Sequence, residues 1–481
     1  MQCRCAIALL AICVLIIDLY HPASAQDRDQ PIRDWMQGAI DHVQRMRKVT
    51  PFDNRAQRAP RVIFKYQFDL DAEGVIATYQ PSGATFTPNN SFFKDLGTNG
   101  RTCFTCHQPQ DGWGLGAAGA KARFESSFGT DPLFRSIDGA ACPSDPVTTL
   151  ADKRKAYKLL MEKGLIRIGL PLPPAADLQF EVTSVVDPYK CTTTPATGLT
   201  SPTTGIVSVY RRPLPAANLG FVANIMWDGR EPTLESQAVN ATLIHAQANA
   251  APDAGRKAQI VAFEKGLFSA QIFDNRAHRL TAENAAGGPV ALSLQQSKFY
   301  IGMNDPDGLD TRNAKFNPDI FELYKPWAGL LGEDSQTQQR RSIARGEAIF
   351  NSGFCGTCHN TPGVGSRSVD EFRNIGTSDS ANVPNLDITG LPVFTLTCTK
   401  GPLAKLVFKV TDPGRALITG QCADIGRFKS PGIRGLAARA PYFHNGSAAT
   451  LGDLVDFYSR RFTFTLDARQ KADLVNFLAS L

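Results

Sequence analysis

The first residues of the chain differ in hydrophobic pattern from all that follow. An uninterrupted apolar run over residues 6–17 comes after Arg4 and before the small residues 23–25 (Ala-Ser-Ala), a layout typical of a secretory signal peptide. A membrane-spanning helix needs roughly twenty apolar residues, and Asp18 interrupts the run earlier. The pattern therefore predicts cleavage after Ala25, an exported periplasmic chain and no stable membrane anchor.

Helical periodicity marks two segments in the last third of the chain. Ile343, Gly346 and Phe350 share one helical face, and Gly346 allows another helix to approach closely. Further on, Asp467 can cap a helix whose apolar stripe is formed by Leu474, Phe477, Leu478 and Leu481. We expect these two helices to form the core of a compact domain.

The chain is expected to divide near Leu331, because residues 332–335 (Gly-Glu-Asp-Ser) are typical of a linker and a helix start. This gives an N-terminal domain over residues 26–330 and a C-terminal domain over residues 331–481. Within the first, residues 114–204 or thereabouts are rich in Pro, Gly and Thr, which predicts a long loop-rich insertion. The expected fold class is mainly α.

Composition and charge exclude one class of partner. The chain has 43% hydrophobic and 20% charged residues, as ordinary globular proteins do. Its net charge of +6 is small for 481 residues, and Lys and Arg form no dense run, so nucleic-acid binding is not expected. A mildly basic surface can still steer an acidic protein partner.

Two Cys-x-x-Cys-His units carry the most specific chemistry. They consist of Cys103, Cys106 and His107, and of Cys355, Cys358 and His359. Two thiols at this spacing can form thioethers to the vinyl groups of one porphyrin, and the next imidazole can reach its iron. A zinc site or a redox disulfide would need a chance histidine twice. We therefore predict two covalently bound haem c groups, with His107 and His359 as proximal ligands in two cytochrome c-like domains.

Four other cysteines lie beyond the predicted cleavage site and outside these units. An oxidising compartment favours two disulfides among them over free buried thiols, and three connectivities are open. Pairing of sequence neighbours is favoured because each bridge then stays within one loop-rich segment. The pairs would be Cys142 with Cys191 and Cys398 with Cys422.

Three further stretches carry a resemblance to a known family. They cover residues 227–238 (Trp-Asp-Gly-Arg, then Leu-Glu-Ser-Gln-Ala), 428–436 (Phe-Lys-Ser-Pro-Gly-Ile-Arg-Gly-Leu) and 440–451 (Ala-Pro-Tyr-Phe-His-Asn-Gly-Ser, then Thr-Leu). Together with both haem motifs, in this order, they resemble the bacterial dihaem cytochrome c peroxidases and MauG-type enzymes. The resemblance covers most of the chain outside residues 114–204.

The resemblance implies roles for individual residues. In that family the N-terminal haem reacts with hydrogen peroxide, the C-terminal haem stores or relays electrons, and a tryptophan between them helps to conduct. By resemblance, His107 binds the reactive iron, Gln237 is a polar distal residue and Trp227 is the bridge, unless Trp227 is an ordinary core aromatic. A small redox partner, such as a monohaem cytochrome or a cupredoxin, is implied as the electron donor.

The distal side of the first haem departs from the family pattern. Family peroxidases carry a glutamate about ten residues after the distal glutamine, whereas residues 243–247 here read Leu-Ile-His-Ala-Gln. An imidazole can serve as the acid and base that peroxide cleavage needs. We expect His245 to be a substitute catalyst or a sixth ligand that closes the iron, with a structural histidine as the remaining alternative.

The second haem lacks the usual methionine ligand, since every methionine lies at Met303 or earlier. The family's methionine falls fourteen residues after the signature histidine, here His444, and that position is Tyr458, as in MauG-type enzymes. Tyr458 is thus the implied distal ligand or else a core aromatic. His444 is expected to orient the haem surroundings, with ligation of the iron as its alternative role. Calcium between the haems is disfavoured, because the corresponding asparagine region reads Tyr-Arg-Arg-Pro over residues 210–213.

Three functions stay open. The first is a haem peroxidase-like oxidoreductase that reduces peroxide or, in the manner of MauG, oxidises a protein or organic substrate. The second is a dihaem electron-transfer cytochrome without peroxidase activity. The third is a dihaem oxygenase of an organic substrate, as in the related rubber-cleaving proteins. Trp227 and Gln237 favour the enzyme, whereas the missing distal glutamate weakens that assignment.

Overall fold

The computed structural model describes residues 59–191, 206–312, 314–380 and 386–481. The predicted signal segment and its cleavage after Ala25 lie outside the described residues, so export stays a prediction. The described residues all belong to one compact unit. Among the described residues, no helix is both long and apolar enough to span a membrane.

The two helices predicted in the last third form where expected. Asp334 caps the start of α10 (Ser335–Ser352), and Asp467 caps the start of α14 (Ala468–Ala479). Each aspartate side chain accepts a hydrogen bond from a backbone amide of the first turn. The stripe predicted on α14 and just beyond it is buried, and its members are Leu474, Phe477, Leu478 and Leu481.

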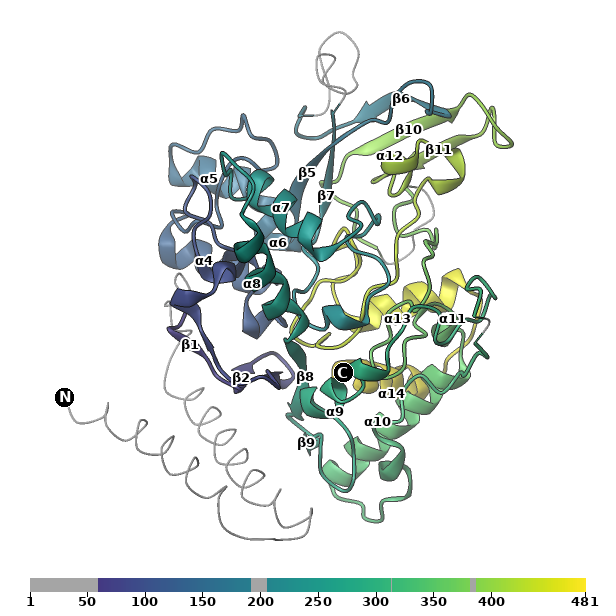
Figure 1. Cartoon of the computed structure of the whole chain (residues 1–481). Helices are drawn as coiled ribbons and strands as arrows, with labels where there is room; N and C mark the ends of the chain where they lie inside the picture. The colour runs from purple at the N-terminus through teal and green to yellow at the C-terminus, as the bar shows by residue number, and fades with distance from the viewer. Residues whose placement is uncertain (1–58, 192–205, 313, 381–385) are drawn as a thin grey trace, which may run out of the picture. The chain divides into compact units, whose positions relative to one another are not determined.

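These helices cross at a glycine, as the sequence predicts. A Cβ atom at Gly346 of α10 would lie 2.0 Å from the Asp473 carbonyl oxygen of α14, so a larger residue would push the helices apart. A third helix, α13 (Leu451–Arg461), also packs against α14 (Figure 1).

A four-stranded antiparallel sheet lies in the other half of the unit. Its order is β2 (Tyr66–Leu70), β3 (Gly74–Tyr79), β8 (Phe268–Asp274) and β9 (His278–Arg279). The Gln271 amide of β8 donates a hydrogen bond to the carbonyl of Leu481, the last residue. The end of the chain is therefore fixed beside this sheet.

Residues 114–204 have more regular structure than their composition indicates. Their described part contains three helices and two strands: α4 (Ala117–Ser127), α5 (Leu150–Ala156), α6 (Lys158–Lys163), β5 (Ile166–Pro171) and β6 (Phe180–Val186). The expectation that this segment is rich in loops is therefore corrected, because its described part contains these helices and strands. Four of the seven residues of β6 (Phe-Glu-Val-Thr-Ser-Val-Val) are β-branched, which favours a strand, and the surrounding Pro, Gly and Thr residues obscured this signal.

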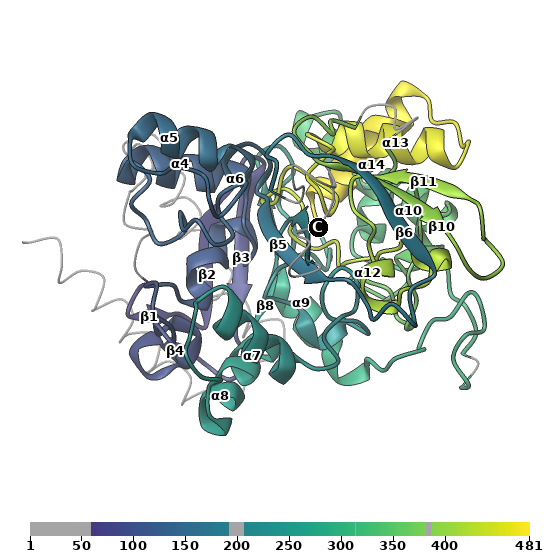
Figure 2. The ribbon, with the colours of Figure 1, turned by 90° about the horizontal axis from the view of Figure 1, so that it is seen from above.

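The strands of this segment pair with strands that follow it in sequence. β5 pairs with β7 (Ile206–Arg211), whereas β6 pairs with β10 (Val393–Cys398), which also pairs with β11 (Val407–Val410). Figure 2 shows β6 lying alongside β10 and β11. Both favoured disulfides are confirmed, with Cα–Cα distances of 5.4 Å for Cys142–Cys191 and 6.1 Å for Cys398–Cys422.

The expected mainly α class is not confirmed, since helices account for 32% and strands for 16% of the structure. Leu331 is 94% exposed, and the division there into two haem domains stays a prediction. The remaining elements are β1 (Val62–Ile63), β4 (Thr85–Phe86), η1 (Thr87–Asn89), η2 (Ser91–Phe93), α3 (Cys103–Cys106), η3 (Pro109–Asp111), η4 (Leu219–Phe221), α7 (Leu234–Ile244), α8 (Ala254–Lys265), α9 (Pro289–Ser293), η5 (Gln296–Lys298), η6 (Lys325–Gly329), α11 (Cys355–Cys358), α12 (Ala416–Thr419) and η7 (Cys422–Asp424).

Candidate functional site

Each Cys-x-x-Cys-His unit folds as one helical turn that ends at its histidine. The cysteines form α3 and α11, and His107 and His359 occupy the C-terminal caps of these turns. All four thiols are free, whereas the other four described cysteines are paired in disulfides. Free thiols beside a histidine are what covalent haem attachment requires.

The two histidines are held in the same way. His107 Nδ1 lies 2.9 Å from the Trp113 carbonyl oxygen, and His359 Nδ1 lies 2.6 Å from the Gly365 carbonyl oxygen, six residues later in each case. A carbonyl oxygen only accepts, so Nδ1 carries the hydrogen and Nε2 keeps its lone pair for a metal. Burial lowers the pKa of both imidazoles, which favours this neutral form.

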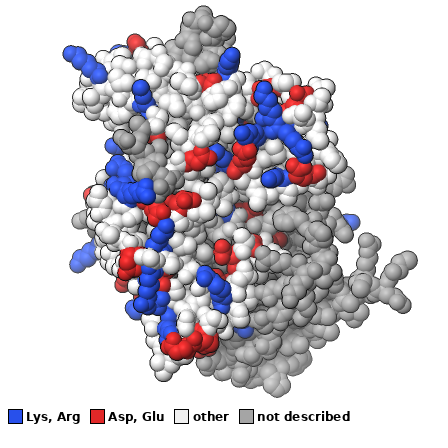
Figure 3. Space-filling model, turned by 180° about the vertical axis from the view of Figure 1, so that it is seen from behind, with Lys and Arg blue, Asp and Glu red and all other residues white. Residues whose placement is uncertain are grey.

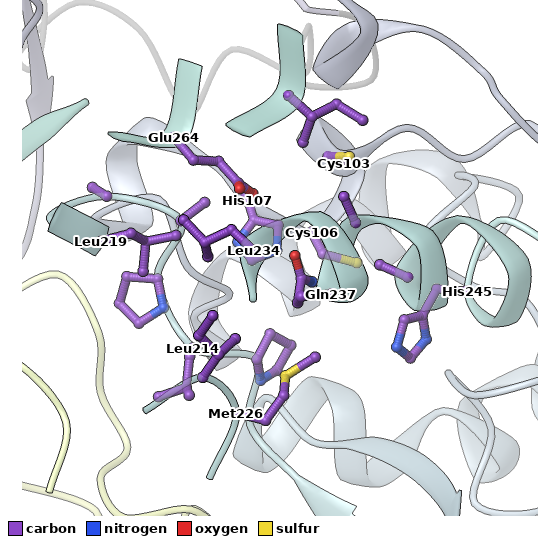
Figure 4. A pocket seen from close by; sticks show the side chains of 18 of the residues that line it. Cys103, Cys106, His107, Leu214, Leu219, Met226, Leu234, Gln237, His245 and Glu264 are labelled. Atoms are coloured by element: carbon purple, nitrogen blue, oxygen red, sulfur yellow. The ribbon is translucent and has the colours of Figure 1, made fainter. Parts of the chain in front are cut away.

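The first unit opens into a cavity of about 1680 Å³, measured with the open space at its mouth (Figure 4). One wall is a face of α7, and the residues of that face recur at helical spacing: Leu234, Gln237, Ala238, Ala241 and His245. Part of α8 and residues 212–227 form further walls. The cavity therefore brings His107 together with Gln237, His245 and Trp227, which the sequence predicts around the first haem.

His245 is fixed by residues that sequence reasoning missed. Its Nδ1 lies 2.6 Å from Asp138 Oδ2, and Arg101 Nη1 lies 2.5 Å from Asp138 Oδ1. Burial raises the pKa of Asp138, but the Arg101 charge and the His245 hydrogen bond outweigh it and hold the pKa below its usual value. A charged Asp138 accepts the Nδ1 hydrogen and leaves the other ring nitrogen of His245 for the cavity.

Trp227 lies between this cavity and the loop of the second motif. Its Nε1 donates to the Arg212 carbonyl at 2.8 Å, and its own carbonyl accepts from the Lys429 amide at 2.9 Å. Two residues beyond Lys429, the backbone of Pro431 contacts the His359 imidazole and raises its pKa against the larger effect of burial. A short run of backbone thus connects Trp227 with His359.

The structure places His444 against Trp227 and not among the residues that line the first cavity. The two rings meet edge to face with centroids 6.2 Å apart, and His444 stacks on Phe428 at 3.9 Å. Burial lowers the pKa of His444 to about 4, and its Nε2 has no hydrogen-bond partner within the described residues. A neutral His444 fits its predicted role of orienting the surroundings, which stays a prediction.

Tyr458 faces the second haem motif from α13. Burial raises the pKa of its phenol, and the Cys358 and Cys355 thiols raise it further. Its ring also contacts Phe443, Phe457 and Phe462. This position suits an axial ligand and equally a core aromatic, so the assignment stays a prediction.

Arg211 belongs to residues 210–213, the region whose sequence disfavours calcium. Its guanidinium is fully buried between Asp228, at 2.5 Å, and Asp412, at 2.6 Å. The charge of Arg211 is therefore paired with the two nearest carboxylates.

Comparison with known proteins gives relatives but no family model that matches. The cytochrome-c peroxidase IdrP2 of Denitromonas iodatirespirans is 33% identical over 145 residues, which are 28% of this chain and 38% of that protein. The cytochrome c551 peroxidase of Nitrosomonas europaea is 31% identical over 154 residues, 32% of this chain and 37% of that protein. The methylamine utilization protein MauG of Methylophilus methylotrophus is 24% identical over 289 residues, 57% of this chain and 69% of that protein.

A similar solved structure is the crystal structure of a MauG-like protein associated with microbial copper homeostasis. Its TM-score is 0.32 at 21% sequence identity, over 58% of this chain and 75% of that chain. The chain spans less than half the length of the two peroxidases. The sequence relatives confirm the resemblance to cytochrome c peroxidases and MauG that the motifs indicated.

Proposed function

We propose that this chain is a periplasmic oxidoreductase of the cytochrome c peroxidase/MauG type, with two haem c groups, and that hydrogen peroxide is its oxidant. The observation that carries the proposal is the repeated histidine–carbonyl hydrogen bond at the two Cys-x-x-Cys-His turns. Reaction with peroxide also needs a cavity with polar side chains beside one of the two turns. Gln237 and His245 line such a cavity at the first turn.

The residues present fit two haem groups. The thiols of α3 would hold one porphyrin and those of α11 the other, and the free Nε2 atoms of His107 and His359 would bind the irons. When bound, haem supplies the electron exchange with peroxide that amino-acid side chains cannot provide. At the second group, Tyr458 is proposed as the distal ligand, and the electrostatic effect of both α11 thiols on its phenol supports this.

Gln237 and His245 are proposed to orient peroxide and to move its proton. The Gln237 amide can both donate and accept a hydrogen bond, so it can fix one peroxide oxygen. The exposed nitrogen of His245 can take a proton from one oxygen and return it to the other. Asp138 keeps the imidazole in one orientation through the 2.6 Å contact.

Trp227 is proposed as the bridge for electrons between the two sites. Its ring lines the first cavity, and its backbone connects through Lys429 to the loop that contacts His359. A small redox protein, a monohaem cytochrome or a cupredoxin, would supply the electrons. Figure 3 shows Lys and Arg interspersed with Asp and Glu on the described surface of one face, so that face does not select a partner by a single sign of charge.

One observation favours the second candidate function, an electron carrier. Met226 also lines the first cavity, and Figure 4 shows its sulfur directed into it. A thioether on the iron would complete the His/Met ligation typical of electron-transfer cytochromes and leave no open position.

Spectra of the haem-loaded ferric protein distinguish the two functions. Electron paramagnetic resonance and electronic absorption are recorded before and after one equivalent of hydrogen peroxide. The proposal predicts one high-spin haem with an open face and a spectral change on addition of peroxide. Two low-spin haems that do not respond to peroxide would establish the carrier instead, and Met226→Ala would then open the first iron.

A further inference from the structure

Glu264 brings a carboxyl group into the cavity from a helix that the proposed function does not yet use. It lies in the last turn of α8, and both Glu264 and Ile260, one turn earlier, line the cavity. α8 packs against α7, the helix that carries Gln237 and His245. Figure 4 labels Glu264, His107 and Gln237 among the side chains that line this cavity. The carboxyl and the proposed peroxide-binding groups therefore share one cavity.

The Glu264 carboxyl is buried without a partner. The residue is 5% exposed, and its Oε2 atom forms no hydrogen bond with any described residue. An ionised carboxylate in this position is unfavourable, because burial penalises the charge and no cation is among the groups that shift its pKa. The C-terminal end of a helix also disfavours negative charge. The neutral acid is therefore the form that this location stabilises.

The charged groups around Glu264 also favour its neutral form. Burial raises its pKa to about 8, and the negative charge of Glu235 on α7 adds to that shift. Cys103 of α3 faces it and feels its charge in turn. Besides α7, the helical turns η2 and η4 pack most closely against α8, and neither carries an ionisable side chain. No neighbouring cation contributes to the shift of the Glu264 pKa.

We propose that Glu264 is the acid of the first cavity: it holds a proton there at neutral pH and gives it to peroxide. The inference rests on the proposed function. Reduction of H2O2 to two molecules of water consumes two protons and two electrons, and the redox partner supplies the electrons. Glu264 supplies these two protons one after the other and regains each from solvent, while His245 transfers the proton already present on peroxide from one oxygen to the other. This provides the carboxyl that residues 243–247 lack.

Infrared difference spectroscopy tests the protonation state directly. Spectra of the haem-loaded protein are compared between about pH 6 and about pH 9, a range that spans the raised pKa. The wild type should show the carbonyl band of a protonated carboxylic acid that disappears with a midpoint near pH 8. Glu264→Gln should lack this band, and Glu264→Asp, which keeps an acid, should retain it. A band that is unchanged in Glu264→Gln overturns the inference.

Glu235→Gln is the matched control, because it removes the neighbouring carboxylate from the exposed side of α7 and leaves Glu264 in place. It should keep the band and lower its midpoint, since a negative neighbour raises the pKa of an acid. A band that disappears in Glu235→Gln and persists in Glu264→Gln would show that Glu235, not Glu264, carries the proton, and this would overturn the inference.

Stopped-flow reaction with peroxide separates this inference from the proposed function. In the wild type the rate should fall as pH rises through about 8, and Glu264→Gln should be slower at neutral pH, on the order of 10²-fold, with no titration in that range. A Glu264→Gln rate and pH profile equal to those of the wild type overturn the proton-donor role. If the wild type itself does not react with peroxide, the proposed function fails, whatever the infrared band shows.

Discussion

Replacement of Asp138 by asparagine tests whether a buried ion pair positions the proton-transfer group of the cavity. Asparagine keeps the volume of the side chain but removes the charge that holds both Arg101 and His245. The His245 imidazole then loses its charge-assisted hydrogen bond and is free to rotate. We expect slower reaction with peroxide, together with lower stability.

The structure sets the size of both effects. The side chains of Asp138 and Arg101 are 4% and 3% exposed, and loss of one partner of a buried pair costs about 3–5 kcal/mol. Arg101 keeps its hydrogen bonds to the Pro132 and Leu133 carbonyls, so we expect the lower end, about 3 kcal/mol. Loss of a positioned acid–base group should slow the reaction on the order of 10²-fold.

Asp131→Asn is the matched control for stability. Asp131 forms an equally buried pair with Arg123, at 2.5 Å, but does not contact His245 or line the cavity. Both variants should lose similar stability in guanidinium unfolding, whereas only Asp138→Asn should slow the stopped-flow reaction with peroxide. Equal rates in the two variants would leave Asp138 with a structural role alone.

A double variant tests whether Asp138 acts through His245. If it does, Asp138→Asn should change the peroxide rate little in a His245→Ala background, because the group that it positions is already gone. Independent, additive losses of rate would refute the positioning argument.

Four other outcomes follow from the structure. His245→Ala should slow reaction with peroxide, and unaltered stopped-flow kinetics would leave the residue as scaffolding. Tyr458→Phe should change the ligand-field spectrum of the second haem, and an unchanged spectrum would remove the phenol from the coordination sphere. Gly346→Ala should destabilise the chain by about 1–3 kcal/mol in urea unfolding, because its Cβ would meet the facing carbonyl at 2.0 Å. The stability that Glu264 contributes should be lost as pH rises from 4.5 to about 8, where the folded residue binds more protons than the unfolded one, so unfolding curves of the wild type and Glu264→Gln should shift in favour of the variant over this range.

The features that could be predicted from the sequence have local signals. A capping aspartate followed by an apolar stripe predicts α14, and Gly346 predicts the helix crossing. The spacing of the cysteines predicts the haem motifs and both disulfides. Each signal lies within about fifty residues, so no knowledge of the tertiary structure is needed to interpret it.

The features that were missed depend on contacts between distant residues. β6 pairs with β10, more than two hundred residues later, and a Pro, Gly and Thr-rich setting obscured its strand pattern. Asp138 reaches His245 from 107 residues earlier, and no motif surrounds it. The carboxyl absent from residues 243–247 enters the cavity from Glu264 on the next helix, which only the packing of α8 against α7 brings into place.

The intact mass of the purified, matured protein tests the central claim most directly. Two porphyrins held by thioethers should add two haem masses to the chain and keep its colour through acid–acetone extraction, and replacement of the α11 cysteines by serine should remove one of them. A mass without added porphyrin, or colour that is extracted, would contradict both proposed haem sites.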